Sequence, residues 1–163
     1  MEVRIFIVVG SNMGDKSANC LTSLELIDSD IPDTEVVKKS ALYSSPPWGK
    51  TDQDDFVNVA AELRSELSPT GLLKALKKIE VDMGRVDSER WGPRLIDIDI
   101  VFYGDAVIDV PALTVPHPGT QERAFTLAPL LELAPGFTHP VLGRTIAELL
   151  DAVDSSKIKK LNS

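Results

Sequence analysis

The sequence has one cysteine, no long hydrophobic run and little positive charge, and each shortage excludes a class of protein. Cys20 is the only cysteine among 163 residues, which excludes an internal disulfide and a zinc cluster built on thiolates. The longest apolar run near the N-terminus, Ile5 to Val9, is shorter than the ~7 residues of a signal-peptide core, and nothing approaches the ~20 apolar residues of a membrane helix. We therefore expect a soluble, cytoplasmic protein without a membrane partner, in which Cys20 is a small apolar residue on a helix.

Basic residues are outnumbered, because 17 Lys and Arg face 25 Asp and Glu, for a formal net charge of −8. A general nucleic-acid binder needs a basic surface, so this class is excluded, and a local basic patch would indicate a specific site. The rest of the composition is ordinary for a globular protein, with 43% hydrophobic and 26% charged residues. At this length we expect one domain, residues 1–163, with a substantial core.

Hydrophobic periodicity and turn residues predict strands and helices in alternation. The best helix has Ser68 as its N-cap, Pro69 at its first position and Gly84 after its end. The predicted strands cover 3–9, 35–45, 56–67 and 95–102, with a short strand at 106–110 pairing back; the helices cover 18–27, 69–83, part of 122–135 and a segment starting at Thr145. The core order is β-α-β-β-α-β, the ferredoxin-like α+β arrangement with both long helices on one face of an antiparallel sheet and C-terminal additions. Fold alone decides no activity.

Two aspartates interrupt the strand "PRLIDIDIVFYG" (93–104). Side chains alternate along a strand, so Asp97 and Asp99 share one face, roughly 6.6 Å apart, and can converge on one small object. Like charges this close need something positive between them. The alternative is a solvated strand face that happens to carry two acids, because an isolated D-x-D motif is weak.

Arginines just upstream favour a shared bound cation over a solvated strand face. Arg85, Arg90 and Arg94 lie in one loop with Trp91, and the guanidinium fork suits phosphate oxygens. Magnesium prefers carboxylates together with substrate phosphates. Acids for a metal and arginines for phosphate in one segment predict phosphoryl transfer, with magnesium carrying a nucleotide.

A second set of residues suggests a flat heterocyclic substrate. Phe56 and Asn58 share the strand face opposite the apolar one, and the loop before them offers Trp48 and the rigid Pro46-Pro47 pair. An aromatic ring beside an amide suits stacking on a heterocycle and hydrogen bonding to its edge. The alternative is a small hydrophobic cluster under a long loop.

The segment "TVPHPGTQERAF" adds a third group. His117 stands between two prolines, which fix the backbone for a ligand contact, and Arg123 and Phe125 again supply a cation and an aromatic plate. A lone loop histidine can also be incidental, which is how we interpret His139. The "GSNMG" after the first strand matches neither nucleotide fingerprint and predicts a turn that starts a helix.

These residues resemble the 6-hydroxymethyl-7,8-dihydropterin pyrophosphokinase family of folate biosynthesis. "RWGPRLIDIDIV" (90–101) is similar to the family signature, and the likeness covers nearly the whole chain. The other matching segments, in order, are "VGSN", "YSSPPWG", "DDFVNVAA", "IEVDMGR", "LTVPHP" and "ERAFTLAPLLELAP". The resemblance implies ATP-dependent diphosphate transfer to the pterin by a monomer, with ATP as co-substrate, two Mg²⁺ ions and no partner beyond its small-molecule substrates.

The resemblance also implies a role for each matching residue. Asp97 and Asp99 would bind both metal ions, and Arg85 and Arg94 would act with them in catalysis. The implied pterin site comprises Ser45, Pro46, Trp48, Phe56, Asn58, Trp91, Asp97 and Phe125. The implied ATP site comprises Lys77, Glu80, Arg85, Arg90, Trp91, Arg94, His117 and Arg123, with the backbone of Ile100 and Thr114 near the adenine.

Some positions depart from the family pattern. A basic residue is often found at three positions that here carry Asp87, Ala112 and Gly119. The loss of these cations should modestly weaken binding of the ATP phosphates. Phe56 replaces a possible Tyr, which keeps the stacking. A rival hypothesis is a regulatory sensor of small molecules without catalysis, which would explain the fold and the pocket but not the arginines beside paired acids.

Overall fold

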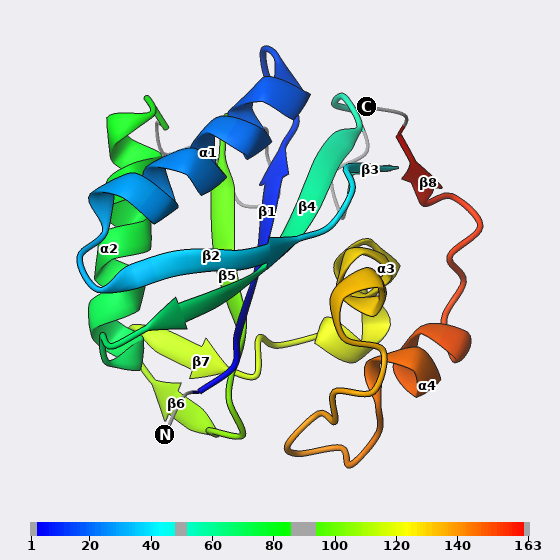
Figure 1. Ribbon diagram of the computed structural model, residues 1–163. Coiled ribbons are helices and arrows are strands. Elements are labelled where there is room, and N and C mark those ends of the chain that lie inside the picture. Colours follow the sequence, from blue (N-terminus) through cyan, green and yellow to red (C-terminus); the bar gives the residue numbers. More distant parts are fainter. Residues whose placement is uncertain (1–2, 48–51, 86–93, 162–163) are drawn as a thin grey trace.

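The computed structural model describes residues 3–47, 52–85 and 94–161, and within these ranges six strands form one antiparallel sheet with helices on both faces (Figure 1). The elements are β1 Ile5–Ser11, α1 Lys16–Asp30, β2 Thr34–Lys39, β3 Tyr43–Ser45, β4 Phe56–Ser65, α2 Pro69–Asp82, β5 Asp97–Tyr103, β6 Ile108–Val110, β7 Leu113–Val115, η1 Thr120–Glu122, α3 Ala124–Leu133, α4 Ile146–Asp151 and β8 Lys159–Lys160. The sheet order is β5-β1-β4-β3-β8, and β2 also pairs with β4. This order confirms the predicted ferredoxin-like α+β fold.

Local signals set the helix ends as the sequence predicts. The Ser68 side chain accepts a hydrogen bond from the Gly71 N–H at the start of α2, and Gly84 follows its end with φ +101°. At α4, Thr145 and Glu148 form the reciprocal capping box. Since each cap satisfies backbone donors that have no partner within the helix, both helices begin where these side chains stand.

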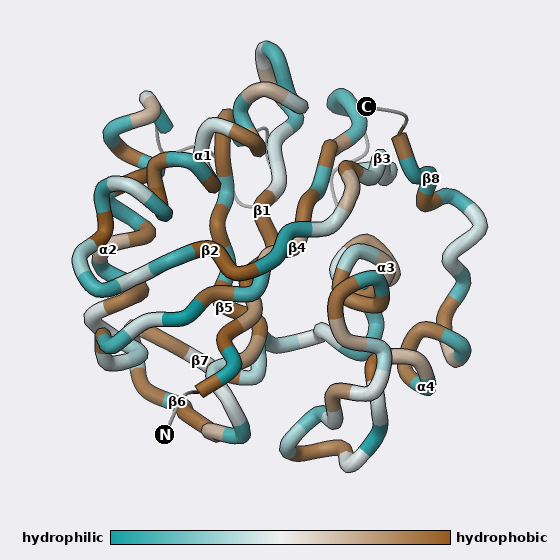
Figure 2. The backbone as a smooth tube through the Cα atoms, viewed as in Figure 1, coloured by the Kyte–Doolittle hydropathy of each residue, from teal (hydrophilic) through white to brown (hydrophobic). Residues whose placement is uncertain are grey.

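The central strand β1 is buried on both sides, because the sheet separates two cores. Ile5, Ile7 and Val9 face α1 and α2, whereas Phe6 and Val8 face the side of α3 and α4. Figure 1 shows α1 and α2 covering one face and α3 and α4 lying against the other. In Figure 2 the hydrophobic segments gather where these layers meet and the turns are mostly hydrophilic. Both long helices therefore share one face, as predicted.

The predicted strand at 35–45 is wrong, because this segment forms two strands. β2 pairs with the second half of β4 and β3 with its first half. Between them the chain leaves the ladder, and the hydroxyl of Ser40 accepts a hydrogen bond from the Ala60 N–H, while the Ser40 N–H donates to the Ala60 carbonyl. Satisfying these backbone groups locally lets the chain change direction without losing hydrogen bonds.

The predicted return of residues 106–110 onto the two-aspartate strand is also wrong. β6 pairs instead with β7, in a separate two-stranded sheet. β7 follows β6 after two residues, so a local hairpin offers the nearer partner.

Two remaining expectations concern Cys20 and membranes. Cys20 is fully buried on α1, and burial raises the pKa of its thiol to about 12, which confirms a small core residue. Among the helices of the described ranges, none is long and apolar enough to span a bilayer.

Candidate active site

A cavity of about 310 Å³ opens on the sheet face opposite α1 and α2, beside the start of α3. Residues from β1, β3, β4, β5 and α3, and from the connections next to α2, β5, β7 and η1, form its walls. They are Val8, Gly10, Ser45, Pro46, Phe56, Asn58, Arg85, Arg94, Asp97, Asp99, Val101, His117, Arg123, Phe125 and Thr126. The cavity therefore combines both predicted groups, the acid–arginine group and the aromatic–amide group.

The floor of the cavity is a row of three paired residues. Gly10 on β1 lies opposite Asn58 on β4 and opposite Asp97 on β5, so the amide and the carboxylate rise from one face on either side of a glycine. A Cβ atom at Gly10 would lie 3.0 Å from Asn58 Oδ1 and 3.5 Å from Phe56 Cδ1. Glycine thus leaves the floor clear, which fits a site where another molecule approaches the backbone.

The two aspartates share one face, as the strand pattern predicts. Asp97 and Asp99 line the cavity, whereas Ile98 and Ile100 are buried in the opposite core. The pKa of Asp99 is raised to about 7, first because partial burial in the cavity disfavours the charged carboxylate and second because Asp97 carries the same charge nearby. A cation placed between these carboxyls would remove that unfavourable charge.

Glu80 organises the cations behind the aspartates. Its carboxylate is 2% exposed and accepts hydrogen bonds from the Ile98 N–H (2.6 Å), from Lys77 Nζ (3.1 Å) and from Arg85 Nη1 (2.6 Å). The other end of the guanidinium, Arg85 Nη2, lies 3.9 Å from Asp97 Oδ1. Glu80 therefore holds Arg85 and Lys77 beside β5. The Nε of Arg85 is a buried donor without an acceptor among the described residues.

The cavity wall beside Asp99 carries a histidine and a third arginine. His117 Nε2 lies 3.7 Å from Asp99 Oδ1, and Arg123 Nη1 lies 3.5 Å from His117 Nδ1. Burial, and then the charge of Arg123, lower the pKa of His117. The Arg123 guanidinium also lies 5.9 Å from the centre of the Phe125 ring. This wall therefore offers the cation of Arg123 next to the aromatic ring of Phe125.

Hydrogen bonds fix the part of the site near β3. The Asn58 side chain donates to Ser45 Oγ at 2.7 Å, and both residues are buried. This bond leaves the Asn58 carbonyl oxygen for another donor and sets the direction in which the amide points. Phe56 lies two residues before Asn58 on the same face of β4, and Phe125 belongs to the same cavity. Aromatic and amide groups therefore occur together here, as predicted.

Seven predicted site residues are not among the described residues that line the cavity. Trp48, Arg90 and Trp91, and the departure at Asp87, lie outside the described residues. Four residues predicted to contact ATP stand outside the lining of this cavity: Lys77, Glu80, Ile100 and Thr114. Ile100 is in the opposite core, and Thr114 is exposed on β7. Their roles toward ATP stay predictions.

Sequence reasoning missed Asn12, which joins three segments at the rim. Its side chain accepts a hydrogen bond from the Arg94 N–H (2.8 Å), and it donates to Gln53 Oε1 (2.8 Å) and to the Asp54 carbonyl (3.1 Å). The turn predicted for "GSNMG" is right only from Asn12 onward, because Gly10 and Ser11 belong to β1, and the asparagine also bonds to Arg94. An Asn directly after a strand, a residue type whose side chain often bonds to backbone groups, is the signal that could have found it; its burial appears only in the structure.

The raised pKa of Asp99 gives a test on the protein without ligands. An acid whose pKa is higher folded than unfolded lowers the free energy of unfolding as pH rises between the two values, here from about 3.8 to about 7. One pKa unit corresponds to ~1.4 kcal/mol, but solvent reaches this side chain and reduces the effect. We expect Asp99→Asn to be more stable than wild type by about 1 kcal/mol at pH 8 and by much less at pH 4.

Thermal unfolding in EDTA at both pH values measures this difference. Asp109→Asn, which removes a carboxylate from β6 away from the cavity, is the control. Equal stability of Asp99→Asn and wild type at pH 8 would show that neither burial nor the charge of Asp97 disfavours ionised Asp99 in the folded chain.

The fold and the cavity together define a ferredoxin-like α+β protein with paired acids, arginines and aromatic rings around one site. The model of the 7,8-dihydro-6-hydroxymethylpterin-pyrophosphokinase (HPPK) family matches residues 6–135. The chain belongs to this family, whose members are ATP-dependent diphosphotransferases of folate biosynthesis.

Individual relatives agree with this assignment. The chain is 43% identical to a 2-amino-4-hydroxy-6-hydroxymethyldihydropteridine pyrophosphokinase of Methylorubrum extorquens, over 97% of this chain and 98% of that one. It is 42% identical to the Pseudomonas aeruginosa protein of the same name, over 99% and 98%. A crystal structure of Plasmodium falciparum HPPK-DHPS with pterin and p-hydroxybenzoate matches with a TM-score of 0.78 at 16% identity, over all of this chain and 47% of that one. The last likeness supports the fold alone.

Proposed function

We propose that this cavity binds 6-hydroxymethyl-7,8-dihydropterin beside ATP and transfers a diphosphate from ATP to the hydroxymethyl oxygen, releasing AMP. The observation that carries the proposal is the row Asn58–Gly10–Asp97, which sets a heterocycle-reading amide next to a carboxylate with open floor between them. The pterin edge and the reacting phosphates can therefore lie in one cavity. We also propose that the chain forms a single domain, acts as a monomer and is located in the cytoplasm.

The donor set fits magnesium that arrives with the nucleotide. Within the described residues there is no group of three or more His, Cys, Asp and Glu that could hold a metal. Asp97 and Asp99 therefore supply two carboxylates, and phosphates and water must supply the remaining ligands, which is the usual arrangement for Mg²⁺. We propose that these residues would hold two ions, which would neutralise negative charge on the phosphates of ATP.

The cations of this chain act on the phosphates directly. Arg85, positioned by Glu80 with its Nη2 near Asp97, and Arg94, which also lines the cavity, would contact the transferred diphosphate. Arg123 lies beside His117 and would contact the remaining phosphate of ATP. The buried Arg85 Nε supports this role, because it is a donor that needs an oxygen.

The pterin is proposed to lie between the two rings. Phe56 and Phe125 would stack on its faces, and Asn58, with Ser45 behind it, would hydrogen-bond its edge. Pro46, Trp48 and Trp91 complete the proposed pterin site, and Lys77, Glu80, Arg90, Ile100, Thr114 and His117 the proposed ATP site. None of these roles requires a side chain to act as a general base, since a loose transition state mainly needs positioning and charge.

The rival function is a sensor that binds the same molecules without turnover. Incubating the protein with ATP and Mg²⁺, with and without hydroxymethyl-dihydropterin, separates the two. We expect ATP to be consumed only when the pterin is present. Binding of both molecules without ATP consumption would favour the sensor and contradict our proposal.

A further inference from the structure

Glu132, outside the cavity, joins three segments that are far apart in the sequence. Its Oε1 accepts a hydrogen bond from the Ala41 N–H at 3.0 Å, and its Oε2 accepts one from the Tyr43 hydroxyl at 2.5 Å. Lys160 Nζ on β8 lies 3.9 Å from the same Oε2. One carboxylate therefore connects α3, the start of β3 and the C-terminal strand.

The helix that carries Glu132 also carries one wall of the cavity. Phe125 and Thr126 line the cavity in the first turn of α3, and Glu132 stands seven residues after Phe125. With 3.6 residues per turn, seven residues make almost two full turns, so both side chains leave the helix on nearly the same side, about 10 Å apart along its axis. A shift of α3 at Glu132 would therefore displace the Phe125 ring as well.

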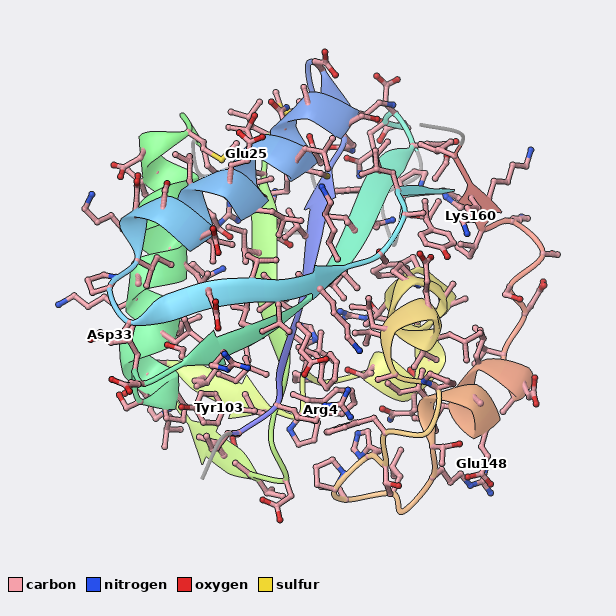
Figure 3. The ribbon with its side chains drawn as sticks, in the orientation of Figure 1. Arg4, Glu25, Asp33, Tyr103, Glu148 and Lys160 are labelled. Carbon is pink, nitrogen blue, oxygen red and sulfur yellow. The ribbon has the colours of Figure 1, made fainter. Side chains whose placement is uncertain are left out.

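The strand that Glu132 contacts leads to the opposite wall. Tyr43 pairs with Asn58, and Ser45, two residues further along β3, pairs with Phe56. Ser45 also accepts the hydrogen bond that orients Asn58. Figure 1 shows α3 beside the edge formed by β3 and β8, and Figure 3 shows Lys160 on β8 at that edge.

The partners of the Glu132 carboxylate are two hydrogen-bond donors and a cation, which suit an anionic acceptor. Burial and then the hydrogen bond to Glu132 raise the pKa of Tyr43, so its hydroxyl stays a donor. β3 is only three residues long, with β4 on one side and β8 on the other, and Leu161 N–H donates to the Leu42 carbonyl. Without the Glu132 contacts, such a short strand has few bonds that set its distance from α3.

Resting on the function proposed above, we propose that Glu132 is a positioning residue that sets the gap between the Phe125 wall and the Ser45–Phe56–Asn58 wall of the pterin site. A flat ring between two aromatic plates needs about 3.5 Å on each face. A small change in that gap therefore weakens stacking on the pterin, while the phosphate-binding groups that α3 does not carry, those on β5 and Arg85 and Arg94, are left in place.

The test compares Glu132→Ala, Tyr43→Phe and their double variant with wild type, measuring direct binding of hydroxymethyl-dihydropterin, binding of a non-hydrolysable ATP analogue, KM for each substrate, and thermal stability. We expect each single variant to weaken pterin binding about three- to tenfold and nucleotide binding less than about twofold. The double variant should bind the pterin no more weakly than Glu132→Ala does, because both substitutions remove the same hydrogen bond between Tyr43 and Glu132. Glu132→Gln, which keeps one acceptor oxygen, should fall between wild type and alanine.

Glu35→Ala is the matched control, because this glutamate pairs with Arg64 on β2 and β4, outside the cavity lining. It should leave pterin binding unchanged. A lower melting temperature for Glu132→Ala with unchanged pterin affinity would overturn the positioning role and leave the proposed function intact. Equal losses for pterin and nucleotide would overturn it too. A wild-type protein that binds no hydroxymethyl-dihydropterin would overturn the proposed function, and this role with it.

Discussion

Replacing Asp97 or Asp99 by asparagine should lower turnover by more than ~100-fold, because each carboxylate is proposed to bind the metal ions themselves, and even indirect partners of a metal typically matter 10–100-fold. Asparagine keeps the shape and one oxygen but loses the charge. The structure predicts that the fold survives, since the two acids repel each other in the folded chain and neither supports the core.

Steady-state turnover and magnesium dependence measure this effect, with circular dichroism to verify folding. Asp109→Asn on β6 is the control and should keep wild-type turnover. Near-normal, magnesium-dependent turnover in both Asp97→Asn and Asp99→Asn would refute the metal assignment.

Removing either aromatic plate should affect the pterin and leave the nucleotide nearly unchanged. Stacking of a base on an aromatic side chain contributes ~1–3 kcal/mol, so Phe56→Ala and Phe125→Ala should each weaken pterin binding roughly tenfold to a hundredfold. Both rings line the cavity, and Phe56 stands beside the amide that would read the pterin edge. Fluorescence or calorimetric titration with the pterin, and separately with an ATP analogue, measures the two affinities.

Phe56→Tyr provides the matched control, because it retains the ring and should bind the pterin within a few-fold of wild type. Similar losses for pterin and nucleotide in Phe56→Ala would mean that the ring supports the fold rather than the heterocycle.

Features with a local cause were predictable from the sequence. The period of two along 97–100 places both aspartates on one face, and the structure confirms it, because Ile98 and Ile100 lie in the opposite core and the register shift between β5 and β1 comes only after Ile100. The ends of α2 and α4 follow from Ser68 and from the Thr145–Glu148 box, whose hydrogen bonds span only three residues. The expected fold followed from the order of such elements.

Features that depend on distant residues were not predictable in the same way. Gly10 reads as part of a turn, and its place in the floor emerges only from the register that sets β1 between Asn58 and Asp97. The break between β2 and β3 depends on Ser40 meeting Ala60, twenty residues later. Glu80 was predicted to line the ATP site, but its buried carboxylate bonds to Ile98, Lys77 and Arg85, a network that no spacing in the sequence shows.

The measurement that tests our account most directly is the identity of the nucleotide product. A common kinase transfers the γ-phosphoryl group and releases ADP, whereas we propose attack on the β-phosphorus with transfer of a diphosphate. The protein is incubated with ATP, Mg²⁺ and hydroxymethyl-dihydropterin, and the nucleotides and pterins are separated by chromatography over time. We predict AMP and a pterin diphosphate, formed in equal amounts. ADP together with a pterin monophosphate would contradict the account.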